Sequence, residues 1–215
     1  MAQSTRVLIL SGPTREYLDP VRYISNASSG RQGAALAREA LARGHDVEIV
    51  QGPAEVQAPN GARVIDVVSA ADMLQQALAR HPFCDVLIGA AAVGDFRPCE
   101  FSTSKHRRTA HSWRLELEPT EDILTRLAAS KGWRVHAGFA LETERALENG
   151  LRKLIEKKLD WIVVNSPAAI GSDEAEYRLL GADGSKHELG LVSKRVVAAR
   201  LLDRLEESLT RIRGR

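Results

Sequence analysis

Cysteine is scarce in this sequence, as are the long apolar runs that mark membrane proteins. Only Cys84 and Cys99 occur among the 215 residues, which is too few for a disulfide framework, and their spacing does not match a zinc site or a redox pair. No stretch approaches the roughly 20 apolar residues that a membrane helix needs, and no secretory signal leads into the first apolar segment. We therefore expect a cytoplasmic protein with free thiols and no membrane association.

A surplus of one charge sign is missing too. The chain has 30 Lys and Arg residues against 28 Asp and Glu residues, a formal net charge of +2, and the interspersed signs argue against nucleic acid as a partner. The six histidines show neither metal-ligand spacing nor the pattern of a hydrolase triad. A hydrophobic content of 44% is ordinary for a globular chain, so residues 1–215 are expected to form a single domain.

The sequence also lacks two common nucleotide-binding fingerprints. A dinucleotide-binding fold would place a tight G-x-G-x-x-G turn after its first strand and an acid after its second strand. This chain has a long polar connection, residues 11–33, at the first position and Val50-Gln51-Gly52-Pro53 at the second. The Walker lysine motif is absent as well. A P-loop ATPase is therefore disfavoured, and a Rossmann-like NAD(P)-dependent reductase remains only as an alternative.

What the sequence does contain is a regular alternation of short apolar strands and helix-forming segments. The predicted strands are 7–10, 47–50, 63–68, 86–92, 135–140 and 161–164, and the predicted helices are 31–43, 69–78, 120–129, 143–158 and 193–209. This alternation predicts an α/β fold, a Rossmann-like and mostly parallel sheet with helices on both faces. Near the C-terminus, 177–180 and 187–189 flank Ala-Asp-Gly and predict a β-hairpin extension.

One segment interrupts this pattern. Residues 94–112 have no hydrophobic periodicity and include the basic run Lys105-His-Arg-Arg108, so we expect a mobile flap at about 98–112, followed by a strand at 113–117. A basic run is usually a solvated surface. On a flap, however, it can close over phosphates and neutralise developing charge.

The helix start at Asn26-Ala-Ser28-Ser29-Gly30 is the first candidate site. The free N–H groups at a helix N-terminus attract anions, and Gly30 and the Ser hydroxyls allow a phosphate to come close. The alternative is that Ser28 or Ser29 only caps the helix. The nearby Arg22 favours the anion site, because a plain connector needs few directional side chains.

The ends of two later strands are the other candidates. Asp95 follows the small residues at 90–92, where it could hold a divalent cation, or it could simply pair with Arg97. Phe139, at the end of a further strand, could stack on a base. Two lysines on the next helix, Lys153 and Lys157, could reach a triphosphate, although their spacing alone fits a solvated face.

Taken together, these segments resemble the phosphopantothenate–cysteine ligase family. The resemblance rests on residues 12–16, 19–26, 28–30, 91–98, 119–123 and 138–143, on Lys105, and on the lysine-rich helix before Asp160 and Asn165. It covers nearly the whole chain. It implies that CTP activates 4'-phosphopantothenate to an acyl-nucleotide, which cysteine then attacks to give 4'-phosphopantothenoylcysteine, a step of coenzyme A biosynthesis.

The resemblance also implies roles for individual residues. Asn26, Arg22, Lys105 and Asp95 would be catalytic, and Asp95 would also bind Mg²⁺. Asn26 would hold the acyl-nucleotide for attack by cysteine, and Lys105 would stabilise the α-phosphate. The nucleotide-binding residues would be Gly12, Ser28, Ser29, Gly30, Ala92, Asp95, Phe139, Ala140, Lys153 and Lys157.

The resemblance further implies a homodimer in which the flap of one subunit approaches the site of the other. It makes a separate flavin-dependent decarboxylase a candidate partner, because this chain begins at its first strand, as a stand-alone ligase would. The sequence departs from the family at Gly94, at Leu141, at Glu118 and in the run Lys105-His-Arg-Arg. These departures leave a catalytically inactive nucleotide-binding homologue as a second alternative.

Overall fold

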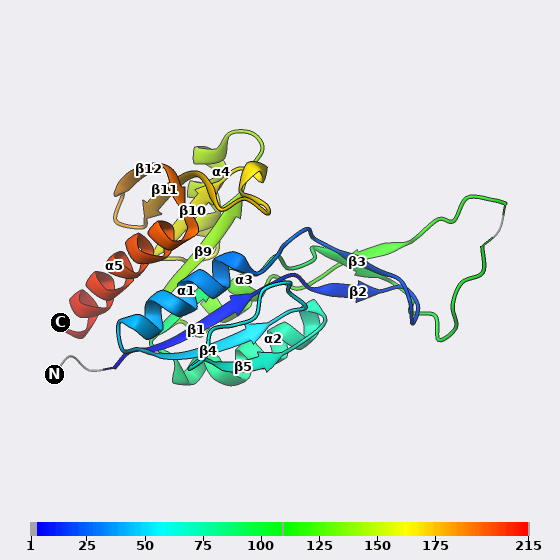
Figure 1. Cartoon of the computed structure of the whole chain (residues 1–215), viewed down its shortest axis with the longest axis horizontal. Helices are drawn as coiled ribbons and strands as arrows, with labels where there is room; N and C mark the ends of the chain where they lie inside the picture. Colours follow the sequence, from blue (N-terminus) through cyan, green and yellow to red (C-terminus); the bar gives the residue numbers. More distant parts are fainter. Residues whose placement is uncertain (1–3, 109, 215) are drawn as a thin grey trace.

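A computed structural model of the chain describes residues 4–108 and 110–214. Its centre is an eight-stranded sheet in the order β12-β11-β10-β9-β6-β1-β4-β5 (Figure 1). Six adjacent strands, from β10 to β5, are parallel, and β11 and β12 add an antiparallel hairpin at one edge. The strand bounds are β1 Arg6–Ser11, β4 Asp46–Gln51, β5 Arg63–Asp66, β6 Val86–Gly89, β9 Val135–Leu141, β10 Trp161–Asn165, β11 Glu174–Gly181 and β12 Lys186–Ser193. The predicted α/β fold with a hairpin extension is confirmed.

Helices cover both faces of this sheet, as Figure 1 shows. They are α1 Arg31–Ala42, α2 Ala70–Arg80, α3 Ile123–Ala128, α4 Ala146–Glu156 and α5 Lys194–Arg213. Side chains alternate along β1, so Val7 and Ile9 pack with α1 and α5 while Leu8 and Leu10 pack with α2 and α3. The same alternation along β9 and β10 places α4 on the α2 face. Among the described residues, no helix combines the length and the hydropathy needed to cross a bilayer.

Several predicted boundaries shift for local reasons. The helix predicted at 120–129 is α3, which begins only after Asp122, whose side chain accepts a hydrogen bond from the N–H of Thr125. The helix predicted from 143 begins at Ala146, after Arg145 in a left-handed conformation with φ 46°. Ser69 caps α2 as predicted, in a capping box with Asp72.

The prediction of a strand at 113–117 was wrong. The strand there is β8, Leu117–Pro119, and it pairs with β7, Phe96–Pro98, away from the central sheet. A second small hairpin, β2 Arg15–Tyr17 with β3 Tyr23–Ser25, occupies the long polar connection. Alternating residues in the exposed segment 113–117 resemble a strand in sequence, but only its C-terminal end pairs with a neighbour: Leu117 lies opposite Pro98, and the N–H of Cys99 donates a hydrogen bond to the carbonyl of Glu116.

The two hairpins and the segment between β7 and β8 form an arm that projects from the carboxyl edge of the sheet (Figure 1). The buried Asp19 attaches the two parts of this arm: its carboxylate accepts hydrogen bonds from the backbone N–H groups of Val21, Arg22 and His106 and pairs with the Arg22 guanidinium at 2.5 Å. Burial by itself would raise the pKa of Asp19, but these donors outweigh burial and lower it to about 2. The segment predicted as a flap is therefore tied to the β2–β3 turn, and its mobility stays a prediction.

Two buried histidines connect the sheet to the helices on the α2 side. The Nε2 atoms of His81 and His136 are 2.8 Å apart, and the two side chains are 1% and 0% exposed. Burial, with a smaller effect of Arg134, lowers the pKa of His81 to about 4. Burial, followed by the effects of His81, Lys131 and Arg134, lowers the pKa of His136 to about 3. The folded protein therefore holds both imidazoles neutral.

We expect the protein to lose stability between pH 6.5 and pH 4 because of this pair. The unfolded chain takes up protons near pH 6.5, whereas the folded chain cannot do so until the pH reaches about 4 for His81 and about 3 for His136. Each histidine then lowers the free energy of unfolding by about 1.4 kcal/mol per pH unit. Urea unfolding at pH 7.5, 6.0 and 5.0 measures the slope. A flat profile in wild type, or an unchanged slope in a His136→Gln variant, would contradict the expectation.

Candidate active site

A cleft lies at the carboxyl edge of the parallel strands, where ligands collect in open α/β sheets. Its larger part, the acidic compartment, has a volume of about 500 Å³. Three of its lining residues are carboxylates, Asp95, Glu121 and Asp122, and Lys157 is its one lysine among the described residues. The rest of its wall consists of Leu10, Asn26, Ala27, Gly89, Ala91, Ala92, Val93, Thr120, Ile123, Leu124, Phe139, Leu141 and Ile170.

The smaller part, the anion compartment, adjoins the first and has a volume of about 170 Å³. Phe139, Ala91, Ala92 and three further residues line both parts. Arg31 and Lys194 line the anion compartment, and no described Asp or Glu does so. The two compartments therefore carry charges of opposite sign, although they share one wall.

The start of α1 forms one side of the anion compartment. Gly30 is the N-cap residue, with φ 78°, and no side chain caps the helix. This excludes the interpretation of Ser28 or Ser29 as a simple N-cap, so both residues are left to line the compartment beside Gly30. The free N–H groups of the first turn lie at the positive end of the helix dipole, which suits an anion.

We expect Gly30→Ala to be more destabilising than Gly44→Ala. Both glycines have φ near 80°, so an alanine meets a similar backbone strain of about 1–2 kcal/mol at either position. A Cβ atom at Gly30 would lie 2.6 Å from the Cβ of Ala54, whereas a Cβ at Gly44 would meet nothing within 4 Å. Overpacking should add a further ~1–3 kcal/mol at Gly30. Equal urea midpoints for the two variants would show that the contact with Ala54 is unimportant.

Asn26 and Asp95 lie in the acidic compartment, as the sequence predicted for a shared site. The Nδ2 atom of Asn26 donates a hydrogen bond to the carbonyl of Val93 at 2.8 Å. Gly12, with φ 78°, lies beneath this wall, and its carbonyl accepts a hydrogen bond from the N–H of Ala92. A Cβ at Gly12 would lie 2.8 Å from the carbonyl oxygen of Gly52, so this glycine supports the wall and does not line either compartment.

Phe139 and Ala140 point to opposite faces of β9. Phe139 is half-buried and lines both compartments, whereas Ala140 is 1% exposed and packs against Leu154 on the α4 side. Of this pair, only Phe139 therefore offers its side chain to a bound molecule. Leu141, one of the departures from the family pattern, is exposed and lines both compartments as well.

Lys153, on α4, and Lys157, at its C-cap, have different positions. Lys157 lines the acidic compartment and pairs with Asp122 at 2.6 Å. Lys153 lines neither compartment, because its Nζ atom pairs with the carboxylate of Glu142 at 2.7 Å. Both are half-buried ion-pair partners, so the interpretation of a freely solvated lysine face was wrong.

Arg22 and Lys105 lie on the arm and line neither compartment. Arg22 pairs with Asp19 and lies with its guanidinium carbon 5.7 Å from the ring centre of Trp113, which stacks on His106. Lys105 is exposed, and Figure 1 shows its segment extending away from the sheet. Within one chain, the fold therefore separates these two predicted catalytic residues from Asn26 and Asp95.

The predicted alternative of an ion pair between Asp95 and Arg97 does not appear. Arg97 pairs instead with Glu118 across the β7–β8 hairpin, at 2.7 Å. Adjacent strands bring these two side chains opposite each other, whereas Asp95 lies just before β7 and remains exposed in the acidic compartment. The departure at Glu118 therefore has a local partner in Arg97.

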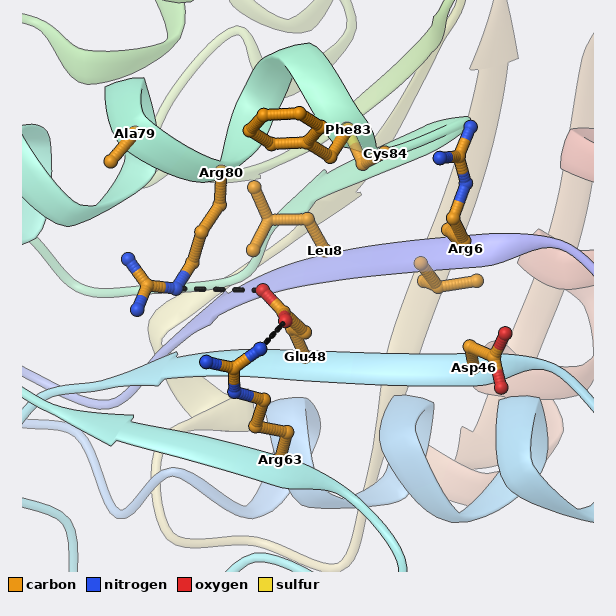
Figure 2. Close-up of a pocket in the computed structure, with 10 residues that line it drawn as sticks. Arg6, Leu8, Asp46, Glu48, Arg63, Ala79, Arg80, Phe83 and Cys84 are labelled. Carbon is orange, nitrogen blue, oxygen red and sulfur yellow. Dashed lines mark hydrogen bonds and ion pairs between the residues drawn. The ribbon is translucent and has the colours of Figure 1, made fainter.

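A second cavity of comparable size, about 520 Å³, lies at the amino edge of the sheet. Figure 2 shows three of its charged side chains turned toward one another: Glu48 pairs with Arg63 at 2.9 Å and with Arg80 at 3.4 Å. The carboxylate of Glu48 is thus already engaged by two arginines, and the carboxyl ends of the parallel strands lie at the opposite edge of the sheet. We therefore place the candidate active site in the two compartments.

Sequence reasoning assigned no role to five residues that line the cleft. Tyr177, Lys194 and Asn165 line the anion compartment, although Asn165 was part of the family resemblance without an assigned role. Glu121 and Asp122 line the acidic compartment. Glu121 and Asp122 could have been found from the sequence, because both lie in the segment 119–123 that resembles the family. Nothing local pointed to Tyr177 or Lys194, because β11 and α5 reach the cleft only through the order of strands in the sheet.

Comparisons with known proteins agree with this arrangement. Residues 2–209 match the family model described as "DNA/pantothenate metabolism flavoprotein C-terminal domain". The chain is 37% identical over 208 residues to the coenzyme A biosynthesis bifunctional protein CoaBC of Bacillus subtilis, covering 94% of this chain and 51% of that protein. It is 39% identical over 206 residues to a cysteine/cysteine sulfinic acid decarboxylase of an unknown prokaryote, covering 93% of this chain and 57% of that protein.

The chain thus spans about half the length of these curated relatives. Among solved structures, the crystal structure of the C-terminal domain of a CoaBC protein has a TM-score of 0.84 at 36% identity, and 96% of each chain is covered. The motifs, the fold and these matches agree over nearly the full chain. The chain therefore belongs to the family of DNA/pantothenate metabolism flavoprotein C-terminal domains, as its resemblance to the phosphopantothenate–cysteine ligases predicted.

Proposed function

We propose that the protein is a phosphopantothenate–cysteine ligase that uses a nucleoside triphosphate, CTP in the first instance. A carboxylate oxygen of 4'-phosphopantothenate attacks the α-phosphorus, pyrophosphate leaves, and the amine of cysteine then displaces the nucleoside monophosphate to form the amide bond. The observation that carries the proposal is the cleft itself. Its anion compartment, with Arg31 and Lys194, suits the phosphates, and its acidic compartment suits polar nucleoside groups and an amine. The two compartments meet beside Phe139.

Each proposed role has a physical reason. Ser28, Ser29 and Gly30 bind phosphate oxygens at the start of α1, where the helix dipole favours negative charge. Phe139 and the small residue Ala92 form the wall against which a base stacks. Asn26 holds the acyl group and donates a hydrogen bond to the oxyanion that forms when cysteine attacks.

The residues of the acidic compartment also fit a magnesium ion that arrives with the nucleotide. The described residues contain no group of three or more ligating side chains that could hold a metal by themselves. Mg²⁺ commonly binds one or two carboxylates together with substrate phosphates and water, and Asp95 is an exposed carboxylate in the cleft. When bound, the ion would neutralise phosphate charge.

We further propose that the enzyme works as a homodimer. Lys105 lines neither compartment within one chain, yet a basic group at the α-phosphate would speed acyl transfer. The arm carries exposed apolar side chains, including Phe101, Trp113 and Leu115, and contact with a second copy would bury them. In that arrangement, the arm of one subunit supplies Lys105 to the cleft of the other.

The setting of the enzyme is part of the proposal. The two cysteines are free thiols, as expected for a cytoplasmic protein, and a separate flavin-dependent decarboxylase would consume its product. The test of the whole proposal is pyrophosphate release from CTP, and separately from ATP, with 4'-phosphopantothenate in the presence and absence of cysteine. Formation of 4'-phosphopantothenoylcysteine is the expected result. No pyrophosphate with either nucleotide would overturn the ligase, and a fluorescence change on NADPH titration would favour a reductase.

A further inference from the structure

The anion compartment has an inner wall that the proposed ligase roles do not use. Tyr177 from β11 and Lys194 from the start of α5 line it opposite the first turn of α1. Its volume of about 170 Å³ is below the range of about 300–1,000 Å³ that is typical of sites for drug-sized ligands. It therefore suits a compact group, and not a nucleoside.

Tyr177 offers this space an unused hydrogen-bond donor. Its side chain is 1% exposed, and its hydroxyl group makes no hydrogen bond of normal geometry among the described residues; the side chain of Asn165 acts on it only as a weak donor, so the hydroxyl proton has no acceptor. Burial raises the pKa of Tyr177, an effect that the neighbouring Asn165 only partly offsets, so the hydroxyl keeps its proton. A buried hydroxyl without a partner is costly by about 1–3 kcal/mol, and a bound acceptor removes this cost.

Lys194 adds a cation without a carboxylate partner among the described residues. Its Nζ atom donates hydrogen bonds to the backbone carbonyls of Ala169, at 3.0 Å, and of Ser172. Arg31 lies nearby and pairs with Asp173 at 3.1 Å, but that carboxylate is 90% exposed and is therefore strongly screened. Two cations and a helix N-terminus thus converge on a small space that contains no carboxylate.

From this geometry we propose that the inner wall binds the two outer phosphate groups of the nucleoside triphosphate, with Lys194 and Tyr177 as the residues that select a pyrophosphate group over a single phosphate. The inference rests on the proposed ligase function. When the substrate carboxylate bonds to the α-phosphorus, the bond from that phosphorus to the bridging oxygen breaks and its electron pair leaves with pyrophosphate. Lys194 and Tyr177 stabilise the charge that collects on this leaving group.

The experiment measures binding of inorganic pyrophosphate by calorimetry, with Mg²⁺ present, to wild type, Tyr177→Phe, Lys194→Met and Lys194→Arg. We expect Tyr177→Phe to weaken binding about 5-fold and Lys194→Met about 10-fold or more, with partial recovery in Lys194→Arg. Binding of CMP should change little, because its phosphate lies outside the inner wall. Lys186→Met, at an exposed position on β12, is the matched control. Thermal unfolding shows whether the variants fold.

The same variants separate this inference from the proposed function. In the ligase assay, Tyr177→Phe and Lys194→Met should raise the KM for CTP and leave the KM for 4'-phosphopantothenate unchanged. Ligase activity with unchanged pyrophosphate affinity in both variants would overturn the inference alone. Pyrophosphate binding that depends on Lys194 and Tyr177, without any amide product, would support the subsite and overturn the ligase. If the variants lost CMP binding and pyrophosphate binding equally, Tyr177 and Lys194 would have only a structural role, which would contradict the inference.

Discussion

An Asn26→Asp variant is expected to release a burst of pyrophosphate, close in amount to the number of active sites, and then to stop. Steady-state formation of the cysteine adduct should fall by about 10²–10³-fold, the loss typical of a missing oxyanion donor. A carboxylate cannot donate the hydrogen bond that the Nδ2 atom of Asn26 gives to Val93. It also adds negative charge to a compartment that already holds Asp95, Glu121 and Asp122.

The two half-reactions should respond differently to this change. In the first, on the proposed mechanism, the new charge resides on phosphate oxygens at the start of α1, in the anion compartment, which Asn26 does not line. In the second, on the same mechanism, charge would develop on the acyl oxygen that Asn26 is proposed to hold. Quenched-flow measurement of pyrophosphate and of the acyl-nucleotide separates these steps. Equal loss of both would mean that position 26 only maintains the cleft.

Ser25→Ala is the matched control for the Asn26 variant. Ser25 precedes Asn26, and its hydroxyl donates a hydrogen bond to the carbonyl of Thr14 at 2.7 Å without lining either compartment. Its loss disturbs the same loop by about 1 kcal/mol. We expect both half-reactions to proceed at nearly the wild-type rate in this variant. A defect as large as that of Asn26→Asp would indicate that loop disturbance alone explains the effect.

Lys105→Gln is expected to lower the rate of pyrophosphate formation by about 10²-fold or more, because a positive charge is lost where the α-phosphate carries charge. If the arm acts on a second subunit, mixing inactive Lys105→Gln with inactive Asn26→Asp should restore activity. Random exchange makes half of the dimers mixed, each with one intact site, so about a quarter of the wild-type activity should return.

This mixing experiment tests whether Lys105 and Asn26, which the fold separates within one chain, act together across two subunits. Lys105 lies on the arm and Asn26 lines the acidic compartment of the same chain. Arg107→Gln serves as the control, since Arg107 is an exposed cation two positions along the same segment. It should keep most of the activity. Absence of recovery on mixing, with subunit exchange verified by mass spectrometry, would contradict action across subunits.

The sequence by itself determined the α/β fold and much of the site, because both depend on short-range patterns. Alternating apolar strands and helices require a covered, mostly parallel sheet. The motifs at the ends of β1, β6 and β9 had to meet, because parallel strands bring their carboxyl ends to one edge. Asn26, Asp95 and Phe139 accordingly share a cleft, and the sequence also identified Ser69 as a helix cap.

Tertiary structure alone decided which predicted residues reach that cleft. Ala140 is buried because it is one residue from Phe139 on a strand, and Lys153 is taken up by Glu142, a partner that no local pattern indicated. Asp19 holds the arm together through donors up to 87 residues away along the chain. Tyr177 and Lys194 arrive at the start of α1 from β11 and α5, since side-chain contacts across a sheet follow the order of its strands, which local sequence does not encode.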